Sequence, residues 1–302
     1  MKLFIDADSI LFKAACTQDN VHDTKQVVDR VIKDTMSDCW AKETYLAIKG
    51  KGNFRYDVYK DYKANRKDKE MDEKLRERLN AAYFYIVDKW EAVPADGMEA
   101  DDLVCIWAHE AREADENWVI AHIDKDINQI AGNHYNYNTK QIYFIDDEEA
   151  DMNFCIQLLI GDSGDNIPKI RKGYGVKTAQ KALVGTTYDN RMDRVVNEWQ
   201  RGYGRGWEKQ LNMIGNLIYM KRTWDLEEWN YEDRCTRQTN VGEQNGRDQS
   251  NSNEGRTEVH TDVPDSGIQG VSEEVHGSDG VNGMAVCSNS TLEDNADSSV
   301  QQ

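Results

Sequence analysis

The sequence predicts an α/β fold with a mostly parallel sheet flanked by helices, followed by a helical region and a disordered tail. Three observations support this prediction. Short apolar segments alternate with amphipathic segments over residues 1–150, as in sheets whose parallel strands are joined by helices. Strand patterns stop after Asp146, whereas helical spacing continues to about Arg222. From Asn240 onward the chain contains no Phe, Trp, Tyr or Lys.

Each expected element follows from the spacing of its apolar residues. Residues 2–6 form a short apolar run that ends in an acid, which is typical of a buried strand. Residues 24–40 and 72–90 repeat apolar side chains at helical spacing. In chain order, strands are expected at 2–6, 44–48, 91–93, 118–123, 135–137 and 141–145, and helices at 24–40, 72–90, 98–114 and 125–131.

Acidic residues are concentrated at the C-terminal end. The formal net charge is −18, and residues 240–302 contain twelve acids and two arginines, a net of −10. A segment this polar cannot bury enough apolar surface to offset the entropy lost on folding. We therefore expect residues 240–302 to be disordered. The overall acidity argues against a protein that coats DNA by general positive charge. Any nucleic-acid contacts would come from local basic patches.

The composition also bears on the compartment. No apolar run approaches the roughly 20 residues that span a bilayer, and the first six residues already include an acid, unlike a signal peptide. The six cysteines are scattered and form no Cys-x-x-Cys, which argues against a zinc ribbon or a disulfide framework. We therefore expect a cytoplasmic, monomeric protein without membrane contacts.

Acidic side chains recur where the expected strands end. Four separate segments supply them: Asp6 after the first strand; Glu99, Asp101 and Asp102 at a helix start; Asp124 and Asp126 after strand 118–123; and Asp162 and Asp165 in a glycine-rich turn. The carboxyl ends of parallel strands meet at one edge of a sheet, so these acids should converge. An all-oxygen set without His or Cys favours Mg²⁺, or Mn²⁺ in its place. Any single acid could instead be a helix cap or a solvated charge.

Two basic segments accompany these acids. Residues 49–78 hold eleven basic and seven acidic residues, with four interleaved aromatic residues that could stack on unpaired bases. The basic residues here include Arg55, Lys63, Arg66 and Lys67. Residues 166–181 contain no acid, and hold Lys169, Arg171, Lys172, Gly173, Gly175 and Lys177. Backbone N–H groups at such a glycine turn suit a DNA phosphate.

The motifs, in order, resemble those of the 5′→3′ exonuclease and flap endonuclease family, which includes phage 5′ exonucleases and the 5′-nuclease domain of bacterial DNA polymerase I. They are Phe4-Ile-Asp-Ala-Asp, Asn53-Phe-Arg, Tyr62-Lys-Ala-Asn-Arg, Glu99-Ala-Asp-Asp, Asp124-Lys-Asp and Gly161-Asp-Ser-Gly-Asp-Asn-Ile-Pro. The resemblance covers residues 1 to about 222. It implies a PIN-like nuclease domain over 1–150 with a basic arch at about 49–80, and a helical DNA-binding region over 151–239 with a helix–three-turn–helix element.

The resemblance also implies roles for single residues. The eight acids Asp6, Glu99, Asp101, Asp102, Asp124, Asp126, Asp162 and Asp165 correspond to carboxylates that hold two or more Mg²⁺ ions. Lys63 and Arg66 correspond to arch residues that meet the scissile phosphate. Gly173 and Gly175 correspond to a duplex-binding hairpin that also holds K⁺. The implied activity is hydrolysis of DNA near free or flapped 5′ ends, giving 5′-phosphate products, in a replication or recombination protein that is plausibly phage-encoded and works beside replication proteins.

One position departs from this pattern. Family members usually carry an acid at the end of the second strand, where this chain has Ile48 followed by Lys49. The departure leaves open a non-catalytic protein that binds DNA junctions. A PIN-type ribonuclease is a separate alternative. Asp8, two residues after Asp6, is a further acid that could take part in the site.

Overall fold

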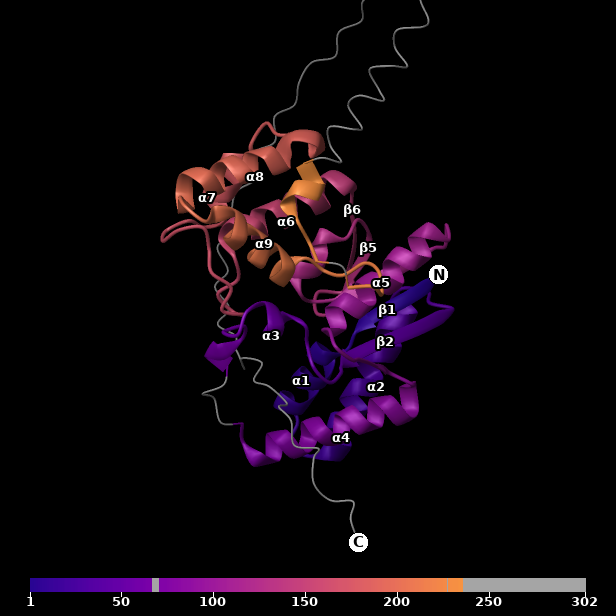
Figure 1. Ribbon diagram of the computed structural model, residues 1–302. Coiled ribbons are helices and arrows are strands. Elements are labelled where there is room, and N and C mark those ends of the chain that lie inside the picture. Colours follow the sequence, from indigo (N-terminus) through magenta and orange to yellow (C-terminus); the bar gives the residue numbers. More distant parts are fainter. Residues whose placement is uncertain (67–70, 227, 236–302) are drawn as a thin grey trace, which may run out of the picture.

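A computed structural model of the chain describes residues 1–66, 71–226 and 228–235 (Figure 1). Its strands are β1 Lys2–Asp6, β2 Glu43–Lys49, β3 Val93–Ala95, β4 Trp118–His122, β5 Gly132–Asn136 and β6 Gln141–Ile145. Its helices are α1 Asp8–Thr17, α2 Val21–Asp38, α3 Arg55–Val58, α4 Glu73–Trp90, α5 Ala100–Glu113, α6 Asp147–Ile160, α7 Val176–Leu183, α8 Tyr188–Tyr203 and α9 Trp207–Ile218, with 3₁₀ turns η1 Ala64–Arg66 and η2 Lys125–Gln129.

The six strands form one sheet in the order β3-β2-β1-β4-β5-β6. All neighbouring pairs are parallel except β5 and β6, which form an antiparallel hairpin. The strand order reverses between β1 and β4, since the chain runs from β1 outward to β3 and then returns to β4. In open α/β sheets, ligands bind beside the carboxyl ends of the strands at such a reversal.

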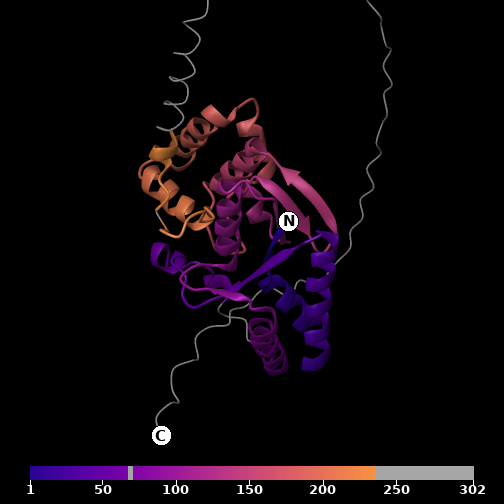
Figure 2. The same ribbon diagram turned by 90° about the vertical axis from the view of Figure 1, so that its right-hand side faces the viewer.

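Helices cover both faces of the sheet. On one face, apolar residues of α1, α2 and α4 pack with Leu3 and Ile5 of β1. On the other face, α5 packs against Phe4 and Ile120. In Figure 1 the helices α1, α2 and α4 lie below the sheet, and Figure 2 shows the same division from the side. The alternating apolar residues of β1 thus reach two cores, as expected for a parallel strand buried on both faces.

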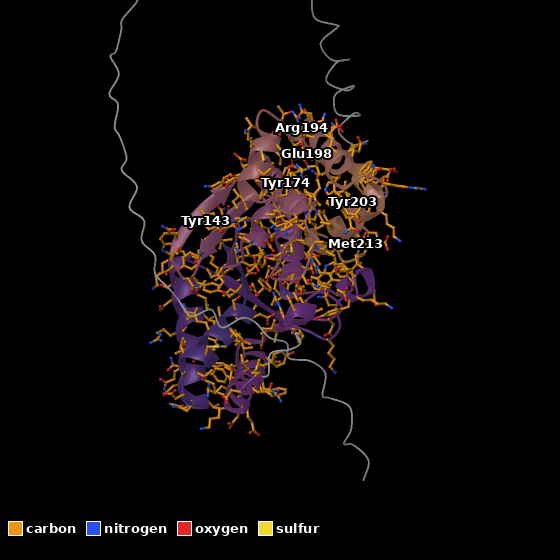
Figure 3. All side chains as sticks on the ribbon, turned by 90° about the vertical axis from the view of Figure 1, so that its left-hand side faces the viewer. Tyr143, Tyr174, Arg194, Glu198, Tyr203 and Met213 are labelled. Carbon is orange, nitrogen blue, oxygen red and sulfur yellow. The ribbon has the colours of Figure 1, made fainter. Side chains whose placement is uncertain are left out.

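Helices α6 to α9 build a third core beside the sheet. Trp199 of α8 is fully buried there, and its indole N–H donates to the backbone carbonyl of Leu158 in α6 at 3.2 Å. Tyr174 packs into the same core and donates its hydroxyl to Glu198 at 3.0 Å, so the glycine turn before α7 is tied to α8 (Figure 3). This region follows the last strand directly, as the end of the strand signal after Asp146 predicts.

The mostly parallel sheet flanked by helices confirms the predicted fold class. Strand 2–6 is found at its predicted bounds, and the expected strand at 91–93 lies slightly later, at β3. Helix α1 has no counterpart among the expected elements. Residues 240–302 and Lys67 lie outside the described residues, so the expectations for them are not addressed. No described helix combines the length and apolar character needed to cross a membrane.

Candidate metal and nucleic-acid site

The predicted acids gather at the carboxyl edge of the sheet, where the strand order reverses. Asp6 is the last residue of β1, and Asp124 follows the neighbouring strand β4 by two residues. Glu99 caps the N-terminus of α5 and Asp101 lies in its first turn. The turn that contains Asp162 and Asp165 follows α6 and closes on itself through paired backbone hydrogen bonds between Asp162 and Ile167.

Neither Asp6, which is buried, nor Asp101, which is half-buried, forms an ion pair among the described residues. Asp6 is only 3% exposed. Burial, followed by the charges of Asp8 and Asp124, raises the pKa of Asp6 well above its ordinary value. Burial and the charges of Asp6 and Asp124 do the same to the pKa of Asp101. These carboxylates therefore lie close enough to repel one another, and a cation among them would relieve the repulsion.

A second group of acids continues the site toward α6. Burial, then the charges of Asp124 and Asp162, raises the pKa of Asp126 to about 8. Asp126 accepts a hydrogen bond from Gln157 of α6 at 2.6 Å. Asp124 accepts from the backbone N–H of Asp126 at 2.8 Å, and Asp162 accepts from that of Gly164 at 2.6 Å. The backbone thus fixes two of these carboxylates in place, and their outer oxygens remain available to a ligand.

Glu99 and Asp165 instead form ion pairs with basic residues at η1. Lys63 forms ion pairs with both acids, and Arg66 forms one with Asp165. The Tyr62 hydroxyl donates to Glu99 at 3.1 Å and to Asp165 at 3.0 Å. Burial alone would raise the pKa of Glu99, but the charges of Lys63 and Arg55 lower it to about 2. Lys63 and Arg66 thus lie at the acid cluster, as the sequence predicts.

Arg55 and Asp102 do not have the surroundings that the sequence prediction gave them. Both are essentially fully buried and form a two-pronged ion pair, with N–O distances of 2.5 and 2.9 Å. Arg55 also donates to the carbonyl of Leu217 in α9 at 2.8 Å, and Asp102 accepts from the backbone N–H of Lys221 at 3.0 Å. Arg55 is too buried to contact DNA. Both carboxylate oxygens of Asp102 already accept hydrogen bonds from the protein. We assign both to holding α3, α5 and the segment after α9 together.

The interleaved aromatic residues are also accounted for by packing. Tyr62 is 1% exposed in the helical core, and Tyr56 packs edge-on against it with ring centroids 5.6 Å apart. Tyr59 packs against the same core, and Phe54 packs against the core under α5. Tyr62 is therefore not free to stack on a base, and the other three rings are half-buried against these cores. In sequence they resemble a binding segment because a short, irregular link shows no periodicity from which burial could be predicted.

Ile48 supplies no ligand oxygen at the end of β2. It is fully buried in β2, where it pairs with Pro94 of β3. Its side chain belongs to the apolar core that α1, α2 and α4 form on one face of the sheet. Gly50, just beyond β2, cannot carry a side chain either, because an added Cβ would lie 2.3 Å from the carbonyl carbon of Ala95. The acid expected at the end of β2 is therefore absent, and neither Ile48 nor Gly50 takes its place.

Asp8, which the sequence offered as a further acid, and Tyr137, which the sequence prediction missed, also lie near this edge. Asp8 accepts a hydrogen bond from the backbone N–H of Lys49 at 2.8 Å. Tyr137, just after β5, lies near the charges of Asp6 and Asp101. Asp8 has a sequence signal in its two-residue spacing from Asp6. Tyr137 has none, because only the fold brings it across β4 to the acids.

The second basic segment is exposed, as a DNA-binding surface requires. The side chains of Lys169, Arg171, Lys172 and Lys177 are all exposed around the glycine turn. Gly173 has a φ of +79°, which favours glycine, and Gly175 is the N-cap of α7. The backbone N–H groups of this exposed turn and of the first turn of α7 can donate hydrogen bonds to a phosphate.

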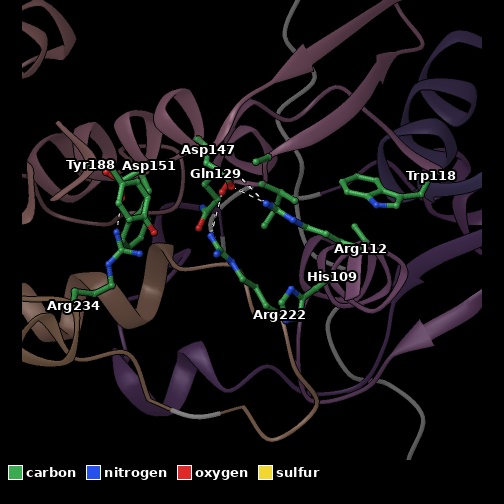
Figure 4. Close-up of a pocket in the computed structure, with 14 residues that line it drawn as sticks. His109, Arg112, Trp118, Gln129, Asp147, Asp151, Tyr188, Arg222 and Arg234 are labelled. Carbon is green, nitrogen blue, oxygen red and sulfur yellow. Dashed lines mark hydrogen bonds and ion pairs between the residues drawn. The ribbon is translucent and has the colours of Figure 1, made fainter. Parts of the chain in front are cut away.

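A cavity between α5 and α6 lies apart from the acid cluster (Figure 4). Its arginines already have partners within the protein. Arg112 pairs with Asp147 at 3.0 Å, Arg234 pairs with Asp151, and Arg222 donates to the carbonyl of Gln129 at 3.2 Å. None of the acids at the strand ends lines it. The cavity is therefore separate from the candidate site.

The donors at the strand ends suit a hard divalent cation in chemistry. They are oxygens only, and the charges of neighbouring acids raise the pKa of both Asp6 and Asp101. Within the described part of the chain, no three acidic, histidine or cysteine side chains already stand in metal-binding geometry. Binding would therefore draw the carboxylates closer together, and the rotatable Asp side chains allow this.

Solved structures with the same fold come from bacteriophage T5. The T5 D15 protein crystallised with metal ions matches with a TM-score of 0.59 at 15% identity, covering 80% of this chain and 98% of that one. A T5 D15 flap endonuclease variant in a pseudo-enzyme-product complex with DNA and metal ions matches with the same TM-score and identity. At this identity the likeness establishes the fold alone.

Two curated relatives match part of the chain in sequence. The 5′-3′ exonuclease of Buchnera aphidicola is 30% identical over 139 residues, which span 43% of this chain and 47% of that protein. DNA polymerase I of Rhizobium leguminosarum is 32% identical over 144 residues, 14% of its length. The matches thus span about half of the first relative and a small part of the second.

The family itself follows from a longer match. Residues 2–154 match the model of the family described as 5′-3′ exonuclease, N-terminal resolvase-like domain. The chain belongs to this family, which confirms the resemblance drawn from its motifs.

Proposed function

We propose that the chain hydrolyses phosphodiester bonds of DNA at or near 5′ ends, with divalent metal ions held by the strand-end acids. The observation that carries the proposal is the group of mutually repelling, buried carboxylates at the point where the strand order reverses, beside Lys63 and Arg66. Family membership and the fold agree with it. The ligands would be Asp6, Asp101, Asp124, Asp126 and Asp162, with Glu99 and Asp165 once their contacts to Lys63 and Arg66 are exchanged.

Mg²⁺ bound at these acids would supply an activated water and charge stabilisation at the leaving oxygen. Lys63 and Arg66 are placed to neutralise charge on a phosphate at the same site, because their side chains are 15% and 24% exposed beside Glu99 and Asp165. Tyr62 fixes Glu99 and Asp165 by its hydrogen bonds. The exposed turn at Gly173 and Gly175, with its lysines and arginine, would hold the duplex by its backbone, and K⁺ could bind there too.

The two alternatives, a protein that binds DNA junctions and a PIN-type ribonuclease, are separated from this function by their action on defined substrates. We expect cleavage of 5′-labelled flapped, nicked or blunt DNA duplexes with Mg²⁺, with products that carry a 5′-phosphate. A ribonuclease would cleave matched RNA faster than DNA, and a junction binder would bind flapped DNA tightly without cleaving it. Equal rates with Mg²⁺ and with EDTA would overturn the metal-dependent mechanism.

A further inference from the structure

Asp8 places a carboxylate where β2 cannot supply one. It is the first residue of α1, yet its Oδ1 accepts the backbone N–H of Lys49, the last residue of β2, at 2.8 Å. Ile48 points into the core, and Gly50 has no room for a side chain beside Ala95. The acid beside the ends of β1 and β2 therefore comes from the first residue of α1, the helix that follows β1.

The surroundings of Asp8 connect it to the other acids. Its backbone N–H donates to Oδ1 of Asp6 at 3.3 Å. After burial, the charge of Asp8 is the next cause that raises the pKa of Asp6. Burial raises the pKa of Asp8 itself to about 6, and Glu99 adds to this, while Lys49 and Lys63 oppose it. Asp8 thus lies between Asp6 and Glu99, on the β2 side of the cluster.

Tyr137 provides an independent sign that a ligand belongs here. The side chain is 7% exposed, and its hydroxyl oxygen is buried without a hydrogen-bond partner. The charges of Asp6, Asp101 and Asp8 raise the pKa of Tyr137, and the Ser9 side chain, which lowers it, lies beside the hydroxyl. A buried hydroxyl without a partner costs free energy. One that faces a group of acids is explained if a bound water completes it.

We propose that Asp8 is a ligand of the divalent-metal site and that the Tyr137 hydroxyl hydrogen-bonds to a water molecule held in that site. This inference rests on the proposed metal-dependent function. The lone Oδ2 of Asp8 is the ligating atom, because Oδ1 is held by Lys49. The Lys49 contact orients the carboxylate in the way that outer hydrogen bonds orient metal ligands in general.

Binding of Mn²⁺ to the whole chain, followed by electron paramagnetic resonance, tests the role of Asp8. Asp8→Asn keeps an acceptor for Lys49 and removes the charge. We expect it to weaken Mn²⁺ binding by about tenfold or more. The matched control is Asp19→Asn, an exposed acid just beyond the far end of α1, which should bind Mn²⁺ like the wild type.

Thermal unfolding separates a ligand from a structural acid. Without metal, Asp8→Asn should unfold at a higher temperature than the wild type, since repulsion with Asp6 is removed. With Mn²⁺, the rise in unfolding temperature should be smaller than for the wild type. Tyr137→Phe should be no less stable without metal and should weaken Mn²⁺ binding about threefold, because it removes a hydrogen bond to the bound water.

The outcomes distinguish this inference from the proposed function. A wild type that cleaves flapped DNA and binds Mn²⁺, with unchanged Mn²⁺ affinity in Asp8→Asn and Tyr137→Phe, would overturn the inference alone. A wild type that neither binds Mn²⁺ nor cleaves DNA would overturn both.

Discussion

Asp101 and Asp102 are neighbours in the sequence, yet the fold gives their carboxylates opposite surroundings. Asp102 points inward to Arg55 and accepts from the backbone as well. Asp101 has no ion pair among the described residues, and the charges of Asp6 and Asp124 add to its burial in raising its pKa. The helical twist alone makes this difference, because successive residues of α5 face different directions. One of the two acids therefore serves the fold, and the other can serve a ligand.

Asp102→Ala should be strongly destabilising. It would leave the Arg55 guanidinium buried without its partner, which typically costs about 3–5 kcal/mol. Urea unfolding followed by circular dichroism measures the loss. Asp101→Asn is the matched control, and without metal it should be as stable as the wild type or more so, since it removes a repelling charge. Equal losses in the two variants would contradict the assignment.

The glycine turn before α7 is the element on which DNA affinity should depend most. Lys172→Ala and Lys177→Ala should each weaken binding to a flapped duplex under conditions that prevent cleavage. Each variant removes an exposed charge near the DNA backbone. The logarithmic dependence of affinity on salt should fall by about one per lysine. Lys42→Ala, which removes an exposed lysine beside β2, is the control. An unchanged salt dependence in both turn variants would exclude this turn as a DNA contact.

At the scale of elements, the sequence predicts best what is periodic. Strand 2–6 and the helix at 72–90 were predictable because apolar spacing reports burial directly. Helix α1 was not, because its apolar pattern continues from the strand before it after a single intervening residue. Residues 53–66 were misinterpreted for a different reason. The three tyrosines of this segment pack into the core of α6 to α9, and Phe54 packs under α5, all of which come later in the chain.

The carboxylates also make stability depend on pH. The pKa of Asp126 is raised from 3.8 to about 8, and those of Asp6 and Asp101 are raised too. As pH rises above 3.8, the unfolded chain releases these protons first, so the folded state is progressively destabilised. Buried His122 and His134 act in the opposite direction, but only below their ordinary value of 6.5.

The free energy of unfolding in EDTA should therefore fall between pH 6.5 and 8, by up to about 1.4 kcal/mol per pH unit for each carboxyl still protonated. Urea unfolding at a series of pH values measures this slope. Mg²⁺ should flatten it, because a cation favours the charged form, and Asp126→Asn should reduce it. Stability that is constant or rising across this window in EDTA would contradict the strained acid cluster.

For the whole molecule, the motifs predicted which acids converge but not how each one is used. That Asp6 and Asp124 share one edge follows from the parallel sheet and could be expected from strand ends. The burial of Arg55 and Asp102 and the arrival of Tyr137 depend on contacts between distant segments. A single sequence does not encode those contacts in any local pattern.

Cleavage of a 5′-labelled flapped duplex in a single turnover, with Mg²⁺ or EDTA, tests the central claim most directly when wild type and Asp124→Asn are compared. Asn at position 124 keeps an oxygen for the backbone N–H of Asp126 and removes only the charge. The account predicts cleavage by the wild type with Mg²⁺ alone, and loss of cleavage in the variant with DNA affinity within about threefold of the wild type. Cleavage that persists in EDTA, or that survives in Asp124→Asn at the wild-type rate, would contradict it.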